Sequence, residues 1–320
     1  MEFSYGDLES TIVEAVRSRC ECRDVAVAFS GGLDSGLISA LAKRYASSVH
    51  LYTCGTANAF DVAMARDLSA KLELPWTHVQ ISKGNVEGCI RRMIAATGES
   101  DPFTISYELP LFCVCEAAEE DVVLSGQGSD EYFMGCAKYV GCSDGDYQAY
   151  VRDGVERLMS VSVPCEERIA AHFGKEMAYP YLDTAVVDEV GRLDPEDLRP
   201  KDMDSRKAVL KAVAVHLGYG VLADRRKKSS QYGSGATDLI RALAREREMM
   251  FNRYIQSLYE DEMEGRSSDH RGSVVNARVD SVLRAKAEDA IRRSGMTVSQ
   301  AIELFYRRVV EEDGPGFLRR

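Results

Sequence analysis

The chain has 320 residues, of which 45% are hydrophobic and 28% charged, and these proportions are typical of a folded globular protein and exclude a disordered or fibrous one. Its 40 Lys and Arg residues against 51 Asp and Glu residues give a net charge of −11, which disfavours nucleic-acid binding unless positive charge is concentrated in one segment. The first twenty residues lack a long apolar core and no later run is long enough to span a membrane, so we expect a cytoplasmic protein with no membrane partner.

The first half of the chain alternates short apolar runs with segments whose apolar residues recur at helical spacing. Strands are predicted at residues 24–29, 49–53, 77–81 and 122–124, and helices at residues 8–17, 36–45, 60–72, 86–96 and 109–118. Strands that alternate with helices of this length pair in parallel, so we expect an α/β fold with a doubly wound parallel sheet. The second half, to about residue 262, has mainly helical periodicity.

A change in composition predicts a boundary near residue 260. Residues 260–272 (EDEMEGRSSDHRG) are polar and lack apolar periodicity, as a linker does. We therefore expect a domain at residues 1–262, a linker at 263–272 and a small module at 273–320. Residues 271–320 hold ten Lys and Arg against seven Asp and Glu, a net charge of +3, which leaves −14 for residues 1–270.

The first predicted strand runs into a glycine-rich turn, SGGLDS, at the start of a helix. Gly31 and Gly32 would let the backbone approach a ligand, and the helix N-terminus with the Ser30 and Ser35 hydroxyls would bind phosphate. The carboxylate of Asp34 is consistent with such a site if Mg²⁺ bridges it to the phosphates. The alternative is an ordinary strand-to-helix turn with a serine cap.

The SGGLDS hexapeptide resembles the pyrophosphate-binding loop of the PP-loop ATP pyrophosphatases, which cleave ATP between its α- and β-phosphates. The resemblance implies that ATP binds here, with adenine near Phe29, Thr53 and Gly55 at the ends of the first two strands. It does not by itself distinguish tRNA thiolases, NAD and GMP synthetases and asparagine synthetases.

A second glycine-rich turn favours asparagine synthetases among these families. Residues 124–133 (LSGQGSDEYF) resemble the LSGEGSDE-[LV]-F segment of asparagine synthetases, which implies that Ser125 and Gly126 contact the nucleotide. Asp130 can place a second carboxylate opposite Asp34, and two carboxylates with triphosphate oxygens suit an octahedral Mg²⁺. The sequence SDE is also a common helix N-terminus, which is the structural alternative.

Two later segments follow the same family order. Residues 175–183 (KEMAYPYLD) resemble E-[VI]-R-x-P-[FY]-L-D, and residues 225–235 (RRKKSSQYGSG) resemble a basic loop that ends in G-x-G. The resemblance implies that Lys227 is catalytic and neutralises charge as pyrophosphate leaves, because a positioned ammonium stabilises developing phosphate charge. Taken alone, the basic run could equally be a solvated surface segment.

The resemblance implies that a carboxylate, with aspartate as the first candidate, attacks the α-phosphate of ATP and that an amine then takes the acyl group. Three features depart from the family: Gln127 replaces a common Glu, Ala178 replaces an Arg, and Met1 is followed by Glu2 where a glutaminase domain would begin with Cys. We therefore expect ammonia or another amine as the nitrogen source, or a separate ammonia-supplying partner.

The C-terminal module is predicted as a strand and two helices. Residues 273–280 (SVVNARVD) alternate in polarity, residues 282–293 and 297–310 have helical periodicity, and Thr297 with Gln300 forms a capping-box pattern. This segment resembles the ribbon–helix–helix antitoxins of the RelB/DinJ type. A single strand with an open edge needs a partner, so we expect a homodimer.

In such antitoxins the paired strands enter the major groove of DNA. The resemblance implies that Asn276 and Arg278 read bases and that the N–H groups after Thr297 hold a phosphate. The ribbon could instead serve only dimerisation.

A second functional hypothesis is a nucleic-acid-linked PP-loop protein, either a tRNA-modifying enzyme or a DNA-binding regulator with an ATP-sensing domain. The charge of −14 on residues 1–270 and the lack of C-x-x-C pairs disfavour a tRNA substrate.

Overall fold

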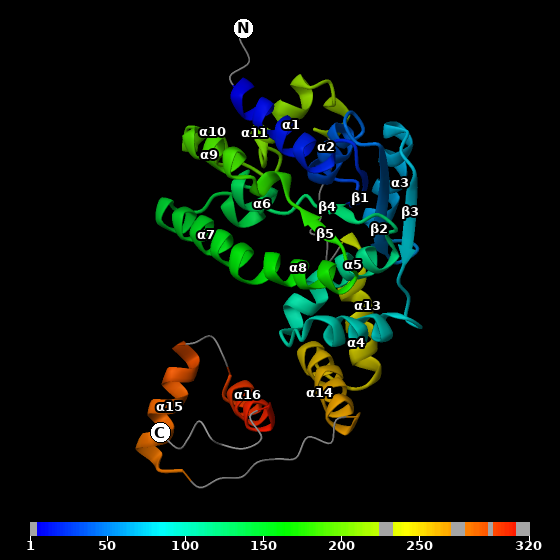
Figure 1. Cartoon of the computed structure of the whole chain (residues 1–320). Coiled ribbons are helices and arrows are strands. Elements are labelled where there is room, and N and C mark those ends of the chain that lie inside the picture. The colour runs from blue at the N-terminus through cyan, green and yellow to red at the C-terminus, as the bar shows by residue number, and fades with distance from the viewer. Residues whose placement is uncertain (1–4, 224–232, 270–278, 294–296, 312–320) are drawn as a thin grey trace. The chain divides into compact units, whose positions relative to one another are not determined.

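The computed structural model describes residues 5–223, 233–269, 279–293 and 297–311. The chain divides into two units, Met1–Arg266 and Ser267–Arg320, each with its own internal contacts. A five-stranded sheet in the order β3-β2-β1-β4-β5 forms the centre of the larger unit, and every neighbouring pair of strands is parallel. Helices cover both of its faces (Figure 1), so the predicted doubly wound α/β fold is present.

The strands are β1 (Asp24–Ala28), β2 (Ser48–Gly55), β3 (Trp76–Gln80), β4 (Val122–Leu124) and β5 (Glu176–Ala178). The helices up to β5 are α1 (Gly6–Cys20), α2 (Leu33–Ala42), α3 (Phe60–Leu72), α4 (Val86–Thr97), α5 (Pro102–Ala117), α6 (Ser129–Tyr132), η1 (Ala137–Tyr139), α7 (Asp144–Arg157), η2 (Leu158–Ser162) and α8 (Val163–His172). Those after β5 are η3 (Pro180–Leu182), α9 (Thr184–Arg192), α10 (Pro195–Leu198), α11 (Ala208–His216), η4 (Gly220–Leu222), α13 (Ala236–Glu246), α14 (Phe251–Asp269), α15 (Ser281–Arg293) and α16 (Val298–Glu311).

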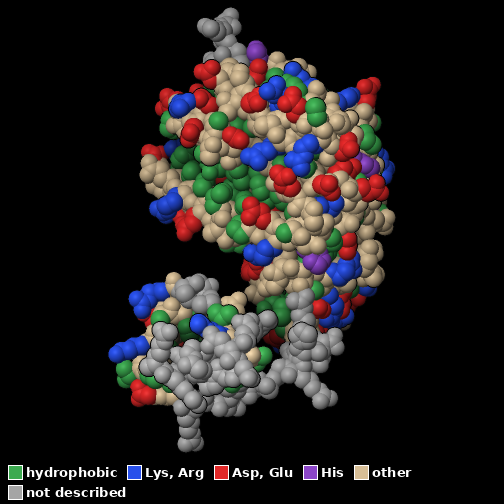
Figure 2. Space-filling view, in the orientation of Figure 1, with side chains coloured by type: hydrophobic (Ala, Val, Ile, Leu, Met, Phe, Trp, Pro, Cys, Tyr) green, Lys and Arg blue, Asp and Glu red, His purple; other side chains and the backbone are tan. Residues whose placement is uncertain are grey.

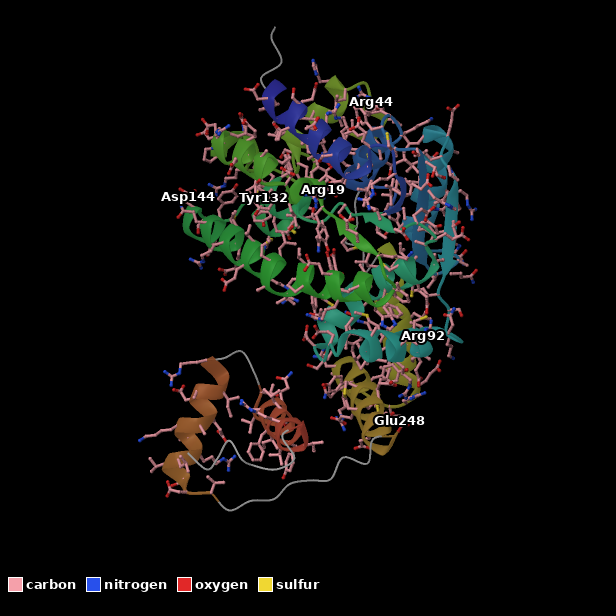
Figure 3. The ribbon with its side chains drawn as sticks, viewed as in Figure 1. Arg19, Arg44, Arg92, Tyr132, Asp144 and Glu248 are labelled. Atoms are coloured by element: carbon pink, nitrogen blue, oxygen red, sulfur yellow. The ribbon has the colours of Figure 1, made fainter. Side chains whose placement is uncertain are left out.

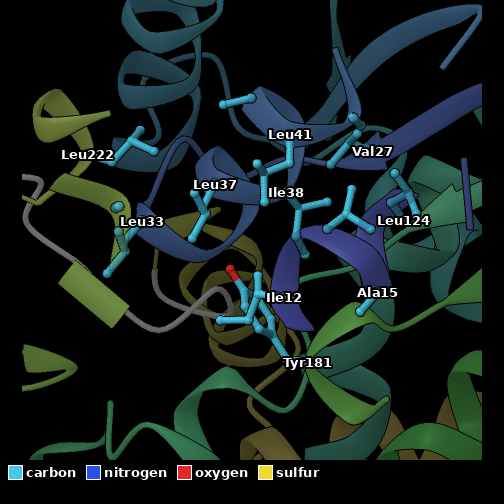
Figure 4. Close-up of a cluster of buried hydrophobic side chains, with 14 of the residues drawn as sticks. Ile12, Ala15, Val27, Leu33, Leu37, Ile38, Leu41, Leu124, Tyr181 and Leu222 are labelled. Atoms are coloured by element: carbon cyan, nitrogen blue, oxygen red, sulfur yellow. The ribbon is translucent and has the colours of Figure 1, made fainter. Parts of the chain in front are cut away.

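Two hydrophobic cores lie on the two faces of the sheet because successive strand residues point in opposite directions. Val25 and Val27 of β1 face the core formed with α1, α2, α3, α9 and α11, part of which Figure 4 shows around Ile12 and Tyr181. Ala26 faces the second core, formed with α4, α5, α8, α13 and α14. Strands buried on both faces explain the nearly unbroken apolar runs in the sequence.

The order of the strands places a topological switch point at the carboxyl ends of β1 and β4. From β1 the chain proceeds to β2 and β3 on one side and then returns to β4 and β5 on the other. The loops after β1 and β4 therefore leave the sheet side by side and open a crevice between them, which is where ligands bind in open α/β sheets.

Three features differ from the sequence-based expectations. The short strand β5 lies in the half predicted as mainly helical, and α5 begins at Pro102 rather than at residue 109, because Asp101 caps it with a 2.8 Å bond from the Thr104 N–H. Helix α14 continues to Asp269 through residues predicted as a linker. The residues of this segment are polar, but a solvent-exposed helix needs no apolar period.

The described part of the smaller unit contains two helices. Asp280 caps α15, since its Oδ1 accepts from the N–H groups of Val282 and Leu283 at 3.0 Å. The predicted capping box of α16 is present: Gln300 Oε1 accepts from the Thr297 N–H at 2.8 Å, and Thr297 Oγ1 accepts from the Gln300 N–H at 3.2 Å. The predicted strand lies outside the described residues up to residue 278, and with it Asn276 and Arg278.

Charged side chains of both signs are interspersed over the visible face of the larger unit (Figure 2), and that face shows no broad patch of positive charge. Many of these groups join neighbouring helices. Arg92 of α4, labelled in Figure 3, makes two contacts of 2.8 Å with the Glu116 carboxylate of α5. None of the described helices has an apolar stretch sufficient to cross a lipid bilayer.

Candidate active site

The loop after β1 brings two serine hydroxyls to the N-terminus of α2. The Ser30 and Ser35 hydroxyl oxygens lie 3.3 Å apart, and Ser30 Oγ also accepts from the Gly32 N–H at 3.4 Å. Gly32 is the N-cap of α2, a helix of ten residues whose first N–H groups face the end of the sheet. Hydroxyl groups beside a helix N-terminus can bind a phosphate group.

Gly31 is required for a structural reason that the sequence did not reveal. Its φ is +72°, and an added Cβ would lie 2.4 Å from the backbone N of Ala65 and 2.5 Å from the carbonyl carbon of Met64. The loop thus packs directly on the backbone of α3. Gly32 has no comparable contact, since its nearest neighbour would be Ser30 Oγ at 3.4 Å.

The loop after β4 touches the first loop. A Cβ on Gly126 would lie 3.1 Å from Asp34 Cβ, so the two turns are in van der Waals contact. Both turns rest on the segment after β5: the Tyr181 hydroxyl donates to the Asp34 carbonyl at 3.1 Å, and Leu182 would collide with a Cβ on Gly128. The KEMAYPYLD segment therefore supports the packing of the two glycine-rich turns.

Asp34 and Asp130 converge on one cation, the ammonium of Lys207. Lys207 Nζ lies 2.5 Å from Asp34 Oδ1, 2.7 Å from Asp130 Oδ1 and 2.9 Å from Ser129 Oγ. The Lys207 side chain is 5% exposed, so these contacts are shielded from water. A Cβ on Gly135 would lie 1.9 Å from Asp130 Oδ1 and 2.2 Å from Lys207 Cε. Any larger residue at position 135 would therefore collide with the ion cluster.

The two carboxylates match the oxygen donors that Mg²⁺ takes together with substrate phosphates. Lys207 now occupies the space between them, so a metal ion would have to displace its ammonium. In the part of the chain that the structure describes, no group of three or more His, Cys, Asp or Glu side chains could hold a metal ion by itself. The donor set thus fits Mg²⁺ only if triphosphate oxygens complete it.

One cavity of about 140 Å³ unites most of the predicted residues. Within the described ranges its lining includes Phe29, Ser30, Asp34, Ser35, Thr53, Ser125, Gly126, Gln127, Ser129 and Asp130. Gly55 is not part of that lining, because its backbone packs on Val62 and Ser234. The Thr53 hydroxyl is already engaged: it donates to the Phe29 carbonyl at 2.5 Å and accepts from the Trp76 indole at 2.9 Å. Lys227 lies outside the described residues.

The same cavity is lined by two buried glutamates that the sequence analysis did not identify. Glu108 comes from α5 and is 2% exposed, and Glu166 comes from α8 and is 3% exposed. Gln127 Nε2 donates to Glu166 Oε1 at 2.7 Å. Gln127, which stands where asparagine synthetases commonly have Glu, thus contacts a carboxyl group from another helix.

Burial changes the acidity of both glutamates. It raises the pKa of Glu108 well above its usual range, and the charge of Glu166 raises it further. Burial also raises the pKa of Glu166 to about 8, although the Tyr179 hydroxyl and the Gln127 amide lower it. At neutral pH the pair therefore retains at least one proton.

No local pattern marks the residues that the sequence analysis missed. Lys207 precedes α11 in a segment of mixed charge, Glu166 stands beside Glu167 and Arg168 in α8, and Glu108 lies among apolar residues of α5. The one available signal is a charged residue on an otherwise apolar helix face, as at Glu108 between Ile105 and Phe112. Ala178 is 1% exposed in β5, and its carbonyl accepts from the Ser125 N–H at 2.9 Å.

Comparisons with known proteins agree with the two resemblances found in the sequence. Residues 7–152 match the family described as asparagine synthase, and residues 272–317 match the RelB antitoxin family. Both resemblances are confirmed for these segments.

Curated relatives are similar over part of the chain. A protein of Methanocaldococcus jannaschii named as a glutamine-hydrolyzing asparagine synthetase is 28% identical in an alignment of 276 residues that covers 74% of this chain and 50% of that protein. Asparagine synthetase B of Escherichia coli is 25% identical in an alignment of 191 residues that covers 53% of this chain and 34% of that protein. The chain spans half or less of the length of these relatives.

Among solved structures, two synthetases match this chain at low structural similarity. The NMN synthetase of Francisella tularensis has a TM-score of 0.37 at 13% identity and matches 87% of this chain and all of its own. The NH₃-dependent NAD synthetase of Campylobacter jejuni has a TM-score of 0.34 at 11% identity and matches 86% of this chain and 99% of its own.

Proposed function

We propose that the larger unit is an ATP-dependent, adenylate-forming amide ligase of the asparagine synthetase type. The observation that carries this proposal is the single cavity in which Ser30, Ser35, Asp34 and Asp130 meet at the switch point of the sheet. In the proposed reaction a substrate carboxylate attacks the α-phosphate of ATP and pyrophosphate leaves. An amine then attacks the acyl carbon, and the amide forms as AMP leaves.

The chain's own residues have distinct parts in this scheme. The α2 N-terminus with Ser30 and Ser35 would hold a phosphate group, and Asp34 and Asp130 would hold Mg²⁺ when ATP binds. Mg²⁺ would supply positive charge to the triphosphate. Lys227 is proposed to neutralise the departing pyrophosphate, and Phe29 to lie beside adenine.

Aspartate is the proposed carboxylate and ammonia or another amine the proposed nucleophile. Both follow from the family resemblance, and Gln127 and Ala178 are the residues at which this chain departs from that family. The ATP–pyrophosphate exchange rate, screened over aspartate and other amino acids, would identify the carboxylate even while the amine is unidentified, because exchange requires only the first half of the reaction.

The first prediction is that Asp34→Asn and Asp130→Asn each lower Mg²⁺-dependent pyrophosphate exchange by about a hundredfold or more, because each removes a carboxylate from the proposed metal site. Asp153→Asn is the matched control, since Asp153 is exposed and pairs with its neighbour Arg152. Exchange should be measured with labelled pyrophosphate in variants whose circular dichroism matches the wild type. Full exchange activity in both folded site variants would contradict the proposed site.

For the smaller unit we propose dimerisation through the ribbon–helix–helix segment, with DNA as a further proposed partner. The proposal is supported by the RelB match and by exposed apolar side chains on α16, including Ile302 and Phe305, each 41% exposed. Asn276 and Arg278 remain the proposed base contacts. The Thr297 hydroxyl is used in the capping box, so a phosphate at this helix would meet backbone N–H groups.

A further inference from the structure

The cavity contains two acidic side chains for which the proposed ATP chemistry has no use. Glu108 and Glu166 project from α5 and α8, two helices that pack against each other on one face of the sheet (Figure 1). Neither belongs to the Asp34–Asp130–Lys207 cluster. A buried carboxyl group is costly unless a partner satisfies it, so a pair of them in one cavity requires an explanation.

The hydrogen bonds of the pair are incomplete. Glu166 Oε1 accepts from the Gln127 amide at 2.7 Å, whereas Glu108 Oε1 has no hydrogen-bond partner within the described part of the chain. Water cannot readily satisfy this oxygen, because Glu108 is only 2% exposed. A carboxyl oxygen that is buried, unsatisfied and part of a cavity wall is suited to accept a hydrogen bond from a bound ligand.

The charges around the pair determine which ligand fits. Among the described residues, the charged groups that act most strongly on the two glutamates include the acids Glu99, Glu131 and Glu167 and the guanidinium of Arg157. Glu99 also pairs with Arg168 at 3.1 Å. An anionic ligand would meet repulsion in these surroundings. A cationic N–H donor would neutralise the pair and satisfy the open acceptor.

We propose that the Glu108–Glu166 pair binds the cationic amino group of a substrate. The proposal rests on the proposed function for the identity of that substrate, which is either the attacking amine or the α-ammonium group of the amino acid that is activated. On binding, the proton held by the pair leaves to solvent, and the ammonium N–H groups donate to the ionised carboxylates. Only the O–H bond of the protonated glutamate breaks in this step. Where the bound group is the attacking amine, its ammonium then transfers one proton to a glutamate carboxylate before the nitrogen attacks.

Gln127 has a positioning role in this arrangement. Its amide donates to one oxygen of Glu166 and thereby directs the other oxygen of that carboxyl. Its backbone N–H donates to Ser125 Oγ at 3.2 Å, within the loop that touches Asp34. The amine site and the proposed phosphate site are therefore connected through one short loop.

The test uses methylammonium chloride as the probe and the full chain, followed by isothermal titration calorimetry in two buffers of different ionisation enthalpy. We expect saturable binding with proton release in the wild type. Glu166→Gln should bind at least about tenfold more weakly, because a hydrogen bond to a charged group is lost. Gln resembles the protonated glutamate, so the fold should persist in this variant. Glu108→Gln provides a second, independent variant of the pair.

Glu156→Gln is the matched control, since it makes the same change at an exposed glutamate of α7. Equal affinity in the wild type and both site variants, or no saturable binding to the wild type, would overturn the proposal. Probe binding without any pyrophosphate exchange would instead preserve the amine site and reject the proposed ligase activity. Sodium chloride at the same concentration corrects for ionic strength.

Kinetics then separate the two sources of the amino group. If the pair holds the amino acid that is activated, Glu166→Gln raises the KM of that amino acid in pyrophosphate exchange. If it holds the attacking amine, the same variant raises the KM of ammonium in amide formation and leaves the KM for the carboxylate close to that of Glu156→Gln. An unchanged KM in both assays would contradict both assignments.

Discussion

Lys207 joins two carboxylates that come from distant segments of the chain. Its ammonium contacts Asp34 at 2.5 Å and Asp130 at 2.7 Å, and all three side chains are largely buried. Two buried carboxylates this close would repel each other without a cation between them. Lys207 therefore offsets this repulsion and holds both side chains in position.

The second prediction concerns this lysine. Lys207→Met should lower the free energy of unfolding by about 3–5 kcal/mol, because it leaves buried charges without their partner. Millimolar Mg²⁺ should then raise the melting temperature of the variant more than that of the wild type, since the freed carboxylates can bind it. Differential scanning fluorimetry with and without Mg²⁺ measures both effects.

Lys211→Met, in the helix that follows Lys207, is the control, because the Lys211 ammonium donates to the Asp204 backbone carbonyl and lies outside the cluster. An equal Mg²⁺ response in Lys207→Met and the wild type would show that the carboxylates do not form a metal site. The double variant with Asp34→Asn should lose the added response.

At this scale the sequence predicts the residues that belong to short motifs and misses those that reach the cavity from elsewhere. Asp34 and Asp130 were identified because each follows a glycine-rich turn after a strand. Lys207, Glu108 and Glu166 were not, because their position depends on how α5, α8 and α11 pack against the sheet. Tertiary packing is not encoded in the residues next to them.

At the scale of elements, the first loop is held between the sheet and α3. Gly31 lies so close to the α3 backbone that an added methyl carbon would be 2.4 Å from Ala65 N. The following residue, Gly32, has ordinary space around it. These two adjacent glycines therefore provide a matched comparison of packing at one loop.

The third prediction is that Gly31→Ala lowers the free energy of unfolding by about 2–5 kcal/mol, because it combines a positive φ with a backbone collision. Gly32→Ala should change it by less than about 1 kcal/mol. Urea denaturation followed by circular dichroism measures both values. Similar denaturation midpoints for the two variants would contradict the proposed packing role of Gly31.

The alternation of strands and helices was predictable because each element carries its own periodicity. Residues 60–72 form α3 with the bounds that the sequence predicts. Strand β5 was missed because its three residues include Glu176 and lack the apolar, β-branched run that marks the equally short β4, and its pairing with β4 supplies the structure. The early start of α5 was missed because the prolines at positions 102 and 110 disfavour a helix prediction. In the structure Asp101 caps the helix, and tertiary contacts stabilise it.

At the scale of the whole molecule, charge and exposed apolar surface are distributed differently between the two units. Residues 1–270 have a net charge of −14 and residues 271–320 one of +3. This separation of charge is consistent with DNA binding by the smaller unit and disfavours DNA binding by the larger unit. If the smaller unit dimerises as proposed, it would bring two copies of the proposed active site into one assembly.

The fourth prediction is that the full chain forms at least a dimer through the smaller unit. On α16, Val298, Ile302 and Phe305 follow one another at helical spacing and are each about 40% exposed, so they form an apolar stripe that is open to solvent along much of its length. Because the two helices of the smaller unit bury too little surface alone, this stripe should pack in a symmetric interface. Substitution of Ile302 and Phe305 together by Glu should shift the protein to monomers, and sedimentation velocity at several concentrations measures this. Ser299→Glu adds charge beside the stripe and should leave the dimer intact, whereas a wild type that sediments as a monomer at tens of micromolar would reject the interface.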